Sequence, residues 1–368
     1  MGIKMKIVTV VGARPQFIKA AAVSRVLRKE YTEILVHTGQ HYDSNMSDIF
    51  FEELHIPNPD FNLGIGSGSH AKQTAEIMIG IEKILLAEKP NYVMVYGDTN
   101  STLAAALAAS KILIPIIHVE AGLRSFNKAM PEEQNRVLTD HISEILFCPT
   151  EIAVQHLKKE GIDKNVYQVG DVMCDAVLYY SKEMEKFDKH YFWNRLKGIY
   201  GTIKPLKKWY LATVHRAENT DTIEKIEEIL AAFENFTAPV LFPVHPRTKP
   251  IVNVLIEKYQ YNNIIFVEPI GYLDMLYFTK NAVKVVTDSG GLQKEAYILE
   301  TDSVTVRDQT EWVETLEGNY NVLCKPKKED ILEKVYQTEV SREKRKALYG
   351  KGNASEKICD ILKNKDKN

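Results

Sequence analysis

The chain has 368 residues, which is long for a single core and suits two α/β domains of about 180 residues each. Its 47 basic and 49 acidic residues leave a net charge of −2, so we expect neither nucleic acid nor an acidic membrane as a partner. No apolar run approaches the roughly 20 residues of a membrane span, and we expect a soluble, cytoplasmic protein.

Short apolar runs that alternate with amphipathic stretches predict parallel strands with helices between them. In chain order, the expected strands are 6–11, 34–37, 92–96, 116–120, 145–148, 166–169, 210–214, 240–244, 264–267, 283–287 and 304–306. Amphipathic stretches at 16–29, 73–86 and 103–111 predict helices in the first half. Charged, aromatic and turn residues interrupt the pattern between 170 and 206, where we expect a domain boundary. The fold class is therefore α/β with two parallel sheets.

Neither the cysteines nor the histidines predict a metal site. The four cysteines form no C-x-x-C pair, and no His, Cys and acid set is spaced to supply three converging ligands. We therefore expect reduced thiols, no disulfide framework and no metal.

The segment TDSGGLQKEA, residues 287–296, predicts a turn from a strand into a helix. Ser289 is placed to cap the helix, while the N–H groups of Gly290 and Gly291 point outward from its first turn. Such a helix end binds anions, and its dipole contributes up to about 2 kcal/mol. Two interpretations stay open: a diphosphate site, with Glu295 accepting from ribose hydroxyls, or an ordinary glycine-rich turn.

The first strand is followed by GARPQFIK, in which Arg14 and Lys19 suit phosphate oxygens. The alternative is a pair of solvated surface cations. The segment lacks the glycines of the G-x-G-x-x-G fingerprint, so we expect no nicotinamide cofactor.

Three acids of the first half follow apolar runs or open a helix: Asp98, Glu120 and Glu132. Carboxyl groups at a partly desolvated strand end have raised pKa values, which suits general acid–base chemistry. Asp98 could instead cap the next helix, and Glu132 could be a surface residue of a first turn. A buried unpaired acid is costly, so Glu120 needs a cation, for which Arg124 is the nearby candidate.

Basic residues follow two strands of the second half. His215 and Arg216 occur in ATVHRAEN, and His245 occurs in FPVHPRT. Together they offer proton donors and phosphate partners. His118, next to Glu120, is more typical of a core histidine or of one that supports the site. In open α/β sheets ligands bind at the carboxyl ends of strands, where all these residues lie.

Eight motifs occur in one order: GARPQFIK, HTGQHYD, YGDTNSTLA, HVEAGLRSF, MPEEQNR, TVHRAEN, PVHPRT and TDSGGLQKEA. In this order they resemble the non-hydrolysing UDP-N-acetylglucosamine 2-epimerases, from about residue 6 to residue 359. The resemblance implies two Rossmann-like domains facing a central cleft, as in glycosyltransferase-B folds. Residues 1–176 would form the first domain, joined by a C-terminal helix at 353–368, and residues 177–352 the UDP-binding domain. It also implies a homodimer.

The resemblance assigns roles to individual residues. The implied catalytic residues are Asp98, Glu120, Glu132 and His215. The expected UDP-sugar ligands are Arg14, Lys19, Arg216, His245, Met275, Ser289, Gly290, Gly291 and Glu295. The family reaction eliminates UDP to leave a 2-acetamidoglucal and then adds UDP back with the other configuration at C2. It uses no cofactor.

The sequence departs from the family pattern at several positions. Trp312 replaces an arginine of the motif T-E-R-P-E, and an indole can pack against an added acyl group of the sugar. A candidate effector site keeps Gln40 and His41 but has Asp43 and Lys72 in place of a glutamine and an arginine. These changes leave UDP-2,3-diacetamido-2,3-dideoxy-glucuronate open as an alternative substrate. A glycosyltransferase, a hydrolysing epimerase and a non-catalytic UDP-sugar sensor are the other functions compatible with the scaffold.

Overall fold

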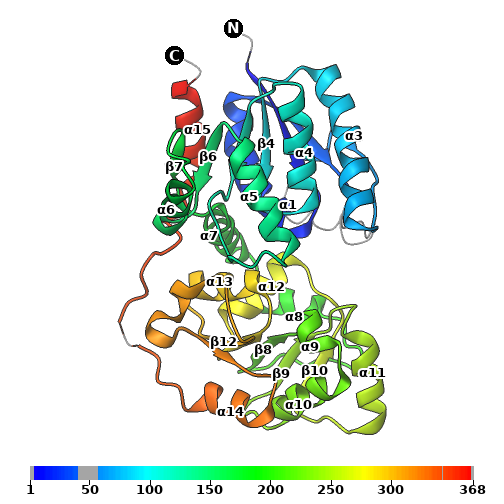
Figure 1. Cartoon of the computed structure of the whole chain (residues 1–368). Coiled ribbons are helices and arrows are strands. Elements are labelled where there is room, and N and C mark those ends of the chain that lie inside the picture. Colours follow the sequence, from blue (N-terminus) through cyan, green and yellow to red (C-terminus); the bar gives the residue numbers. More distant parts are fainter. Residues whose placement is uncertain (1–3, 40–56, 342, 366–368) are drawn as a thin grey trace. The chain divides into compact units, whose positions relative to one another are not determined.

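The computed structural model describes residues 4–39, 57–341 and 343–365. The chain divides into two compact units, of which unit 1 comprises residues 1–176 and 347–368 and unit 2 comprises residues 177–346 (Figure 1). In the described ranges, no helix is both long and apolar enough to cross a membrane.

Unit 1 contains a seven-stranded parallel sheet in the order β3-β2-β1-β4-β5-β6-β7. Its strands are β1 (Lys6–Val11), β2 (Thr32–His37), β3 (Phe61–Asn62), β4 (Tyr92–Tyr96), β5 (Ile116–Val119), β6 (Ile145–Cys148) and β7 (Val166–Gln168). Its helices are α1 (Arg14–Glu30), α3 (His70–Glu88), α4 (Asn100–Lys111), α5 (Pro131–Ile142), α6 (Glu151–Lys159), the first part of α7 (Val172–Met184) and α15 (Ala354–Lys365).

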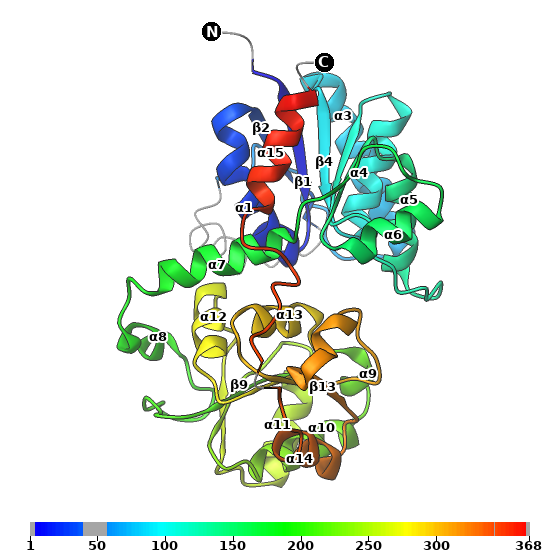
Figure 2. The same cartoon turned by 90° about the vertical axis from the view of Figure 1, so that its left-hand side faces the viewer.

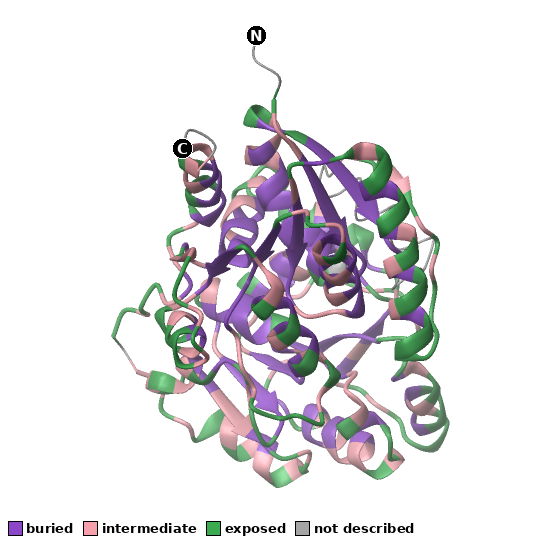
Figure 3. Ribbon diagram, turned by 45° about the horizontal axis from the view of Figure 1, so that its top comes forward, coloured by how far each residue is buried: buried purple, intermediate pink, exposed green. Residues whose placement is uncertain are grey.

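Helices cover both faces of this sheet. Helices α3, α4 and α5 pack side by side on one face, while α1 and α15 pack against each other on the opposite face (Figure 2). The inner strands β1, β2, β4, β5 and β6 are largely buried, as Val/Ile-rich runs in a parallel sheet covered on both faces require, whereas the edge strands β3 and β7 are partly exposed (Figure 3).

Unit 2 contains a six-stranded parallel sheet in the order β10-β9-β8-β11-β12-β13. Its strands are β8 (Tyr210–Thr213), β9 (Val240–Pro243), β10 (Ile264–Val267), β11 (Val285–Thr287), β12 (Ser303–Val306) and β13 (Asn321–Cys324). Its helices are the end of α7, α8 (Lys189–Arg195), α9 (Ala217–Thr220), α10 (Ile223–Glu234), α11 (Lys249–Lys258), α12 (Tyr272–Lys280), α13 (Gly290–Ile298), the 3₁₀ segment η1 (Val313–Asn319) and α14 (Lys328–Tyr336).

The predicted strands and the two parallel α/β sheets are confirmed. Strands β3 and β13 were not expected, because β3 has only two residues and β13 follows the irregular segment η1. The division between the units falls inside α7, within the interval 170–206 where a domain boundary was expected, and that interval also contains α8.

In each sheet the strand order reverses once, between β1 and β4 in unit 1 and between β8 and β11 in unit 2. At such a point the chain leaves the two neighbouring strands toward opposite faces of the sheet, which opens a crevice at their carboxyl ends. Ligands of doubly wound sheets bind there. Each unit therefore has its candidate site at a predictable edge.

The start of α15 is held by a carboxylate of α7 within unit 1. Asp175 accepts hydrogen bonds from the N–H groups of Ala354, at 3.0 Å, and Ser355, at 2.7 Å. Asp175 thereby satisfies two of the amides that a helix start leaves without acceptors.

We expect Asp175→Asn to destabilise unit 1 by about 1–2 kcal/mol, because an amide offers one accepting oxygen instead of two. Far-UV circular dichroism in urea would measure the loss. All three tryptophans lie in unit 2, so their fluorescence should report an unchanged unit 2. Asp360→Asn, an exposed change on α15, is the matched control. Equal urea midpoints for both variants would show that the Asp175 contacts contribute nothing.

Candidate functional site

In unit 1, Glu120 directly follows β5 and forms an ion pair with Lys19 of α1. Glu120 is 9% exposed, and its φ of +73° lies in the left-handed region that non-glycine residues rarely adopt. Such strain is typical of functional residues that the surrounding structure holds in place. The sequence expectation that Arg124 compensates Glu120 is wrong. Arg124 instead binds Asp140 and Glu160, each at 2.7 Å, from α5 and the end of α6.

Gly97, at the end of β4, lies against this ion pair. Its φ is +62°, and a Cβ added there would stand 3.2 Å from Oε2 of Glu120 and 3.6 Å from Nζ of Lys19. A side chain at this position would therefore be strained and would crowd the carboxylate. The glycine lets the ends of β4 and β5 present their acids close to each other.

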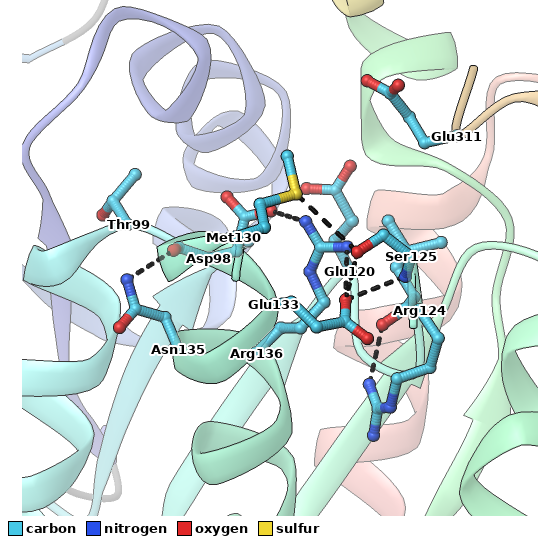
Figure 4. A network of polar contacts seen from close by, with 12 residues as sticks. Asp98, Thr99, Glu120, Arg124, Ser125, Met130, Glu133, Asn135, Arg136 and Glu311 are labelled. Atoms are coloured by element: carbon cyan, nitrogen blue, oxygen red, sulfur yellow. Dashed lines mark hydrogen bonds and ion pairs between the residues drawn. The ribbon is translucent and has the colours of Figure 1, made fainter. Parts of the chain in front are cut away.

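Asp98, the next residue, pairs with the guanidinium of Arg136 (Figure 4). Nη1 of Arg136 also contacts Oε2 of Glu133, at 3.1 Å. Glu133 in turn accepts from the N–H of Ser125, at 2.8 Å, and from that of Phe126, at 2.9 Å. Arg136 thus links the strand end at Asp98 to the loop after β5.

Loss of hydration raises the pKa of the Asp98 carboxyl above its ordinary range. Arg136 opposes the rise, and the negative charge of Glu120 adds to it. For Glu133 the balance is reversed: burial favours a higher pKa, but hydrogen bonds from Ser125 and the charge of Arg136 lower it. The two carboxylates that share Arg136 therefore differ in proton affinity, and Asp98 is the better proton acceptor.

The turn at Asp98 is fixed by neighbouring polar groups. Thr99, not Asp98, caps α4, because its side chain accepts from the N–H of Thr102; the capping interpretation of Asp98 is wrong. His118 is fully buried, as expected for a supporting residue, and its Nε2 donates to the carbonyl of Gly97, at 2.8 Å. Its Nδ1 lies 2.7 Å from Oδ1 of Asp140.

Gln16, which the sequence analysis did not select, joins the two central strand ends of unit 1. Its side-chain oxygen accepts from the N–H groups of Gly12, at 2.8 Å, and Ala13, at 3.0 Å. Its amide nitrogen donates to the carbonyl of Tyr96, at 2.7 Å, and to Thr102, at 2.9 Å. The loop after β1 is thereby fastened to the loop after β4.

The remaining expected residues of unit 1 are less informative. Arg14 begins α1, but its side chain lies outside the described part. Glu132 lies half-buried in the first turn of α5, beside the Glu133 that pairs with Arg136. Lys72 is exposed and lies 3.8 Å from Glu76. Gln40, His41 and Asp43 fall outside the described residues.

In unit 2, the fully buried Asp288 at the end of β11 organises the turn after β8. Its carboxylate accepts from the N–H groups of His215, at 3.0 Å, and Arg216, at 2.9 Å, and from Nδ2 of Asn219, at 3.0 Å. Asp288 was also missed from the sequence. The His215 ring stacks on His245 with centroids 4.9 Å apart, so two imidazoles meet at this edge.

The start of α13 lies at the same edge of unit 2. Ser289 caps the helix as expected, accepting from the N–H of Leu292 at 3.4 Å. A Cβ at Gly290 would stand 2.2 Å from Oε1 of Glu311, so a side chain there would require the Glu311 carboxylate to move. Glu295 is buried on α13, and Met275 is partly buried on α12.

Trp312, whose indole was one candidate contact for an added acyl group of the sugar, is itself only 6% exposed. Its ring lies 4.1 Å from Nζ of the buried Lys294 on α13. Most of the indole is therefore occupied within unit 2. In the described ranges, no group of three His, Cys, Asp or Glu residues could hold a metal ion.

Two Rossmann-like sheets with polar clusters at their reversal points define an α/β protein built to bind nucleotides. The profile of the UDP-N-acetylglucosamine 2-epimerase family matches residues 25–363. A Methanococcus maripaludis protein named a UDP-N-acetylglucosamine 2-epimerase homolog is 53% identical, with 98% of this chain and 100% of the relative covered. The chain therefore belongs to the UDP-N-acetylglucosamine 2-epimerase family, as its motifs indicated.

Two further relatives bear on the substrate. The UDP-2,3-diacetamido-2,3-dideoxy-D-glucuronate 2-epimerase of Pseudomonas aeruginosa is 45% identical, with 97% of this chain and 99% of the relative covered. The Methanocaldococcus jannaschii UDP-GlcNAc 2-epimerase, whose crystal structure in complex with UDP-GlcNAc and UDP is known, is 44% identical in sequence to this chain. It superposes with a TM-score of 0.87 over 98% of this chain and 100% of that chain.

We expect Arg136→Met to raise the pKa of Asp98 further, because it removes the positive charge that opposes the rise. A ¹³C NMR titration of the aspartate carboxyl carbons would measure this directly. If ionised Asp98 is needed for turnover, the acid limb of kcat/KM should move to higher pH. Arg136→Lys keeps the positive charge, so it should shift both the pKa of Asp98 and the acid limb of kcat/KM less than Arg136→Met does. An unchanged or lowered pKa in the methionine variant would contradict the role assigned to Arg136.

Proposed function

We propose that this chain is a non-hydrolysing 2-epimerase that interconverts UDP-N-acetylglucosamine and UDP-N-acetylmannosamine, as the homodimer that the resemblance implies. Membership of the family supports the reaction class. The observation that carries the proposal is the pair of acids at adjacent strand ends, Asp98 and Glu120. Each is paired with a cation, and Asp98 has a raised pKa.

In the proposed reaction, a carboxylate of unit 1 takes the proton from C2 of the sugar. The C1–O bond breaks, the electron pair leaves with UDP, and a C1=C2 double bond remains as 2-acetamidoglucal. Re-addition of UDP at C1, with a proton delivered to the other face of C2, gives the epimer. The raised pKa of Asp98 suits a group that exchanges protons near neutral pH.

The departing UDP requires positive partners where its charge develops. In unit 2, the start of α13 with Gly290 and Gly291 offers amides and the positive end of a helix dipole. Arg216 is held at the same edge, because its Nε donates to the carbonyl of Asp288 at 3.0 Å. His215, stacked on His245, adds a group that can exchange a proton. We assign diphosphate binding to this set, with Arg14 and Lys19 as further candidates.

A second candidate substrate is UDP-2,3-diacetamido-2,3-dideoxy-glucuronate. The Pseudomonas aeruginosa relative that acts on it is about as similar as the relatives named for UDP-N-acetylglucosamine, with 45% identity against 46% for one of the latter. Trp312 is a weak argument for either sugar, because its ring packs on Lys294. The same elimination and re-addition applies to both substrates.

Incubation of the enzyme with each UDP-sugar in heavy water tests the proposal. Elimination removes the C2 hydrogen, so both epimers should acquire deuterium at C2, and no acceptor should be needed. Anomeric NMR signals of the two candidate sugars, run side by side, would decide the substrate. Turnover with protium retained at C2 would exclude elimination, and release of free N-acetylmannosamine would indicate a hydrolysing enzyme. No exchange with either sugar would leave only a binding protein.

We expect Glu120→Gln to lower kcat by about 10²–10⁴-fold, because it removes a proton-transfer group or its charge. UDP affinity, measured by calorimetry, should remain close to that of the wild type, because the change lies in unit 1 and not at the start of α13. Glu144→Gln, an exposed change in unit 1, is the matched control. Activity of Glu120→Gln within about threefold of the control would remove Glu120 from the mechanism.

A further inference from the structure

The carboxylate of Glu311 lies at the start of α13, in the place proposed above for a diphosphate. Its Oε1 is 2.2 Å from the position that a Cβ of Gly290 would take, so it lies directly on the glycine backbone. The same oxygen is 3.8 Å from Nη2 of Arg216, and Oε2 is 2.8 Å from Nη1 of Arg307. Glu311 therefore gathers a helix start and two guanidinium groups around one negative charge.

The segment that carries Glu311 is anchored to α13 on both sides of this residue. Before it, Thr310 donates to Oε1 of Gln293, at 2.7 Å. After it, the N–H of Trp312 donates to Thr310, at 3.1 Å, and the indole packs on Lys294. Gln293 and Lys294 both belong to α13. The carboxylate is thus held at the helix start by the local structure and not by a chance rotamer.

The electrostatics keep Glu311 negative. Burial alone would raise the pKa of its carboxyl, but Arg307 and Arg216 outweigh this effect and lower the pKa. The side chain of Glu311 is 30% exposed to solvent, so water and a ligand can reach it. Arg307 is only 8% exposed, and a buried guanidinium without an anion would be costly. Glu311 supplies that anion while the site holds no diphosphate.

We propose that Glu311 is an intramolecular competitor for the diphosphate: its carboxylate occupies the anion site at the start of α13 and is displaced when a nucleoside diphosphate binds. The inference rests on the proposed assignment of this helix start to the diphosphate. Displacement frees Arg216 and Arg307 to bind phosphate oxygens, so the arginines exchange one anion for another. The competition limits the affinity for UDP, which favours release of the nucleotide-sugar after each turnover.

The opposite role for Glu311 would be to position the two arginines for the ligand. The two roles predict changes of opposite sign when the carboxylate is removed. A competitor weakens ligand binding, so its loss strengthens binding. A positioning residue strengthens ligand binding, so its loss weakens binding.

Calorimetric titration of Glu311→Gln with UDP and with inorganic pyrophosphate separates these roles. We expect both ligands to bind about twofold to fivefold more tightly than to the wild type, the range expected for loss of a partly exposed ion pair. Because pyrophosphate has no uridine, a change in its affinity reports on the diphosphate contacts alone. Glu317→Gln removes the same charge from an exposed residue of η1, which pairs with Lys346 at 2.7 Å, and should leave both affinities unchanged.

Unchanged or weakened binding in Glu311→Gln, with tryptophan fluorescence showing a native unit 2, would overturn the competitor role. Glu311→Ala provides a second variant and should bind both ligands more tightly as well. C2 deuterium exchange by the wild type is measured in parallel. If the wild type exchanges deuterium at C2 but the wild type and the Glu311 variants bind UDP equally well, the competitor role is overturned and the proposed function stands. If the wild type shows neither C2 exchange nor UDP binding, both the proposed function and the inference that rests on it are overturned.

Discussion

The reversal of strand order at the centre of each sheet is the constraint on which the candidate sites depend. Neighbouring parallel strands send the chain to opposite faces there, so the two loops that follow diverge. A buried side chain fastens them in both units. Gln16 joins the loops after β1 and β4, and Asp288 joins those after β8 and β11. These hydrogen bonds hold the two loops of each pair in place at the sheet edge.

The same edges collect charge, and several of their acids pair with basic side chains. Glu120 has Lys19, Asp98 has Arg136, and Glu311 has Arg307 and Arg216. Taking a carboxylate out of water is costly unless it is paired, so these ion pairs offset part of the cost of placing acids at strand ends. They also preset the charge of each site.

Much of the secondary structure was predictable because its signals are local. Apolar runs bounded by turn residues located eleven strands, and TDSGG located the capped start of α13. Strand β3 escaped because two residues make no pattern, and α7 and α8 because charged and aromatic residues masked their periodicity. The alternative interpretation of Asp98 as the cap of α4 was one residue too early, since both Asp98 and Thr99 have side chains that can cap a helix.

The sequence by itself determined that acids and basic residues follow the strands, because the carboxyl ends of parallel strands meet at one edge whatever the details of packing. It could not determine how these residues pair. Glu120 pairs with Lys19, which is 101 residues away, and not with Arg124, because α1 brings the lysine across the sheet edge while α5 and α6 engage the arginine. Arg136 pairs with Glu133, which the sequence analysis did not select, and the candidate Glu132 lies one position earlier, about 100° around the helix. Ion pairs depend on the directions of side chains from separate elements, and only the tertiary structure fixes those directions.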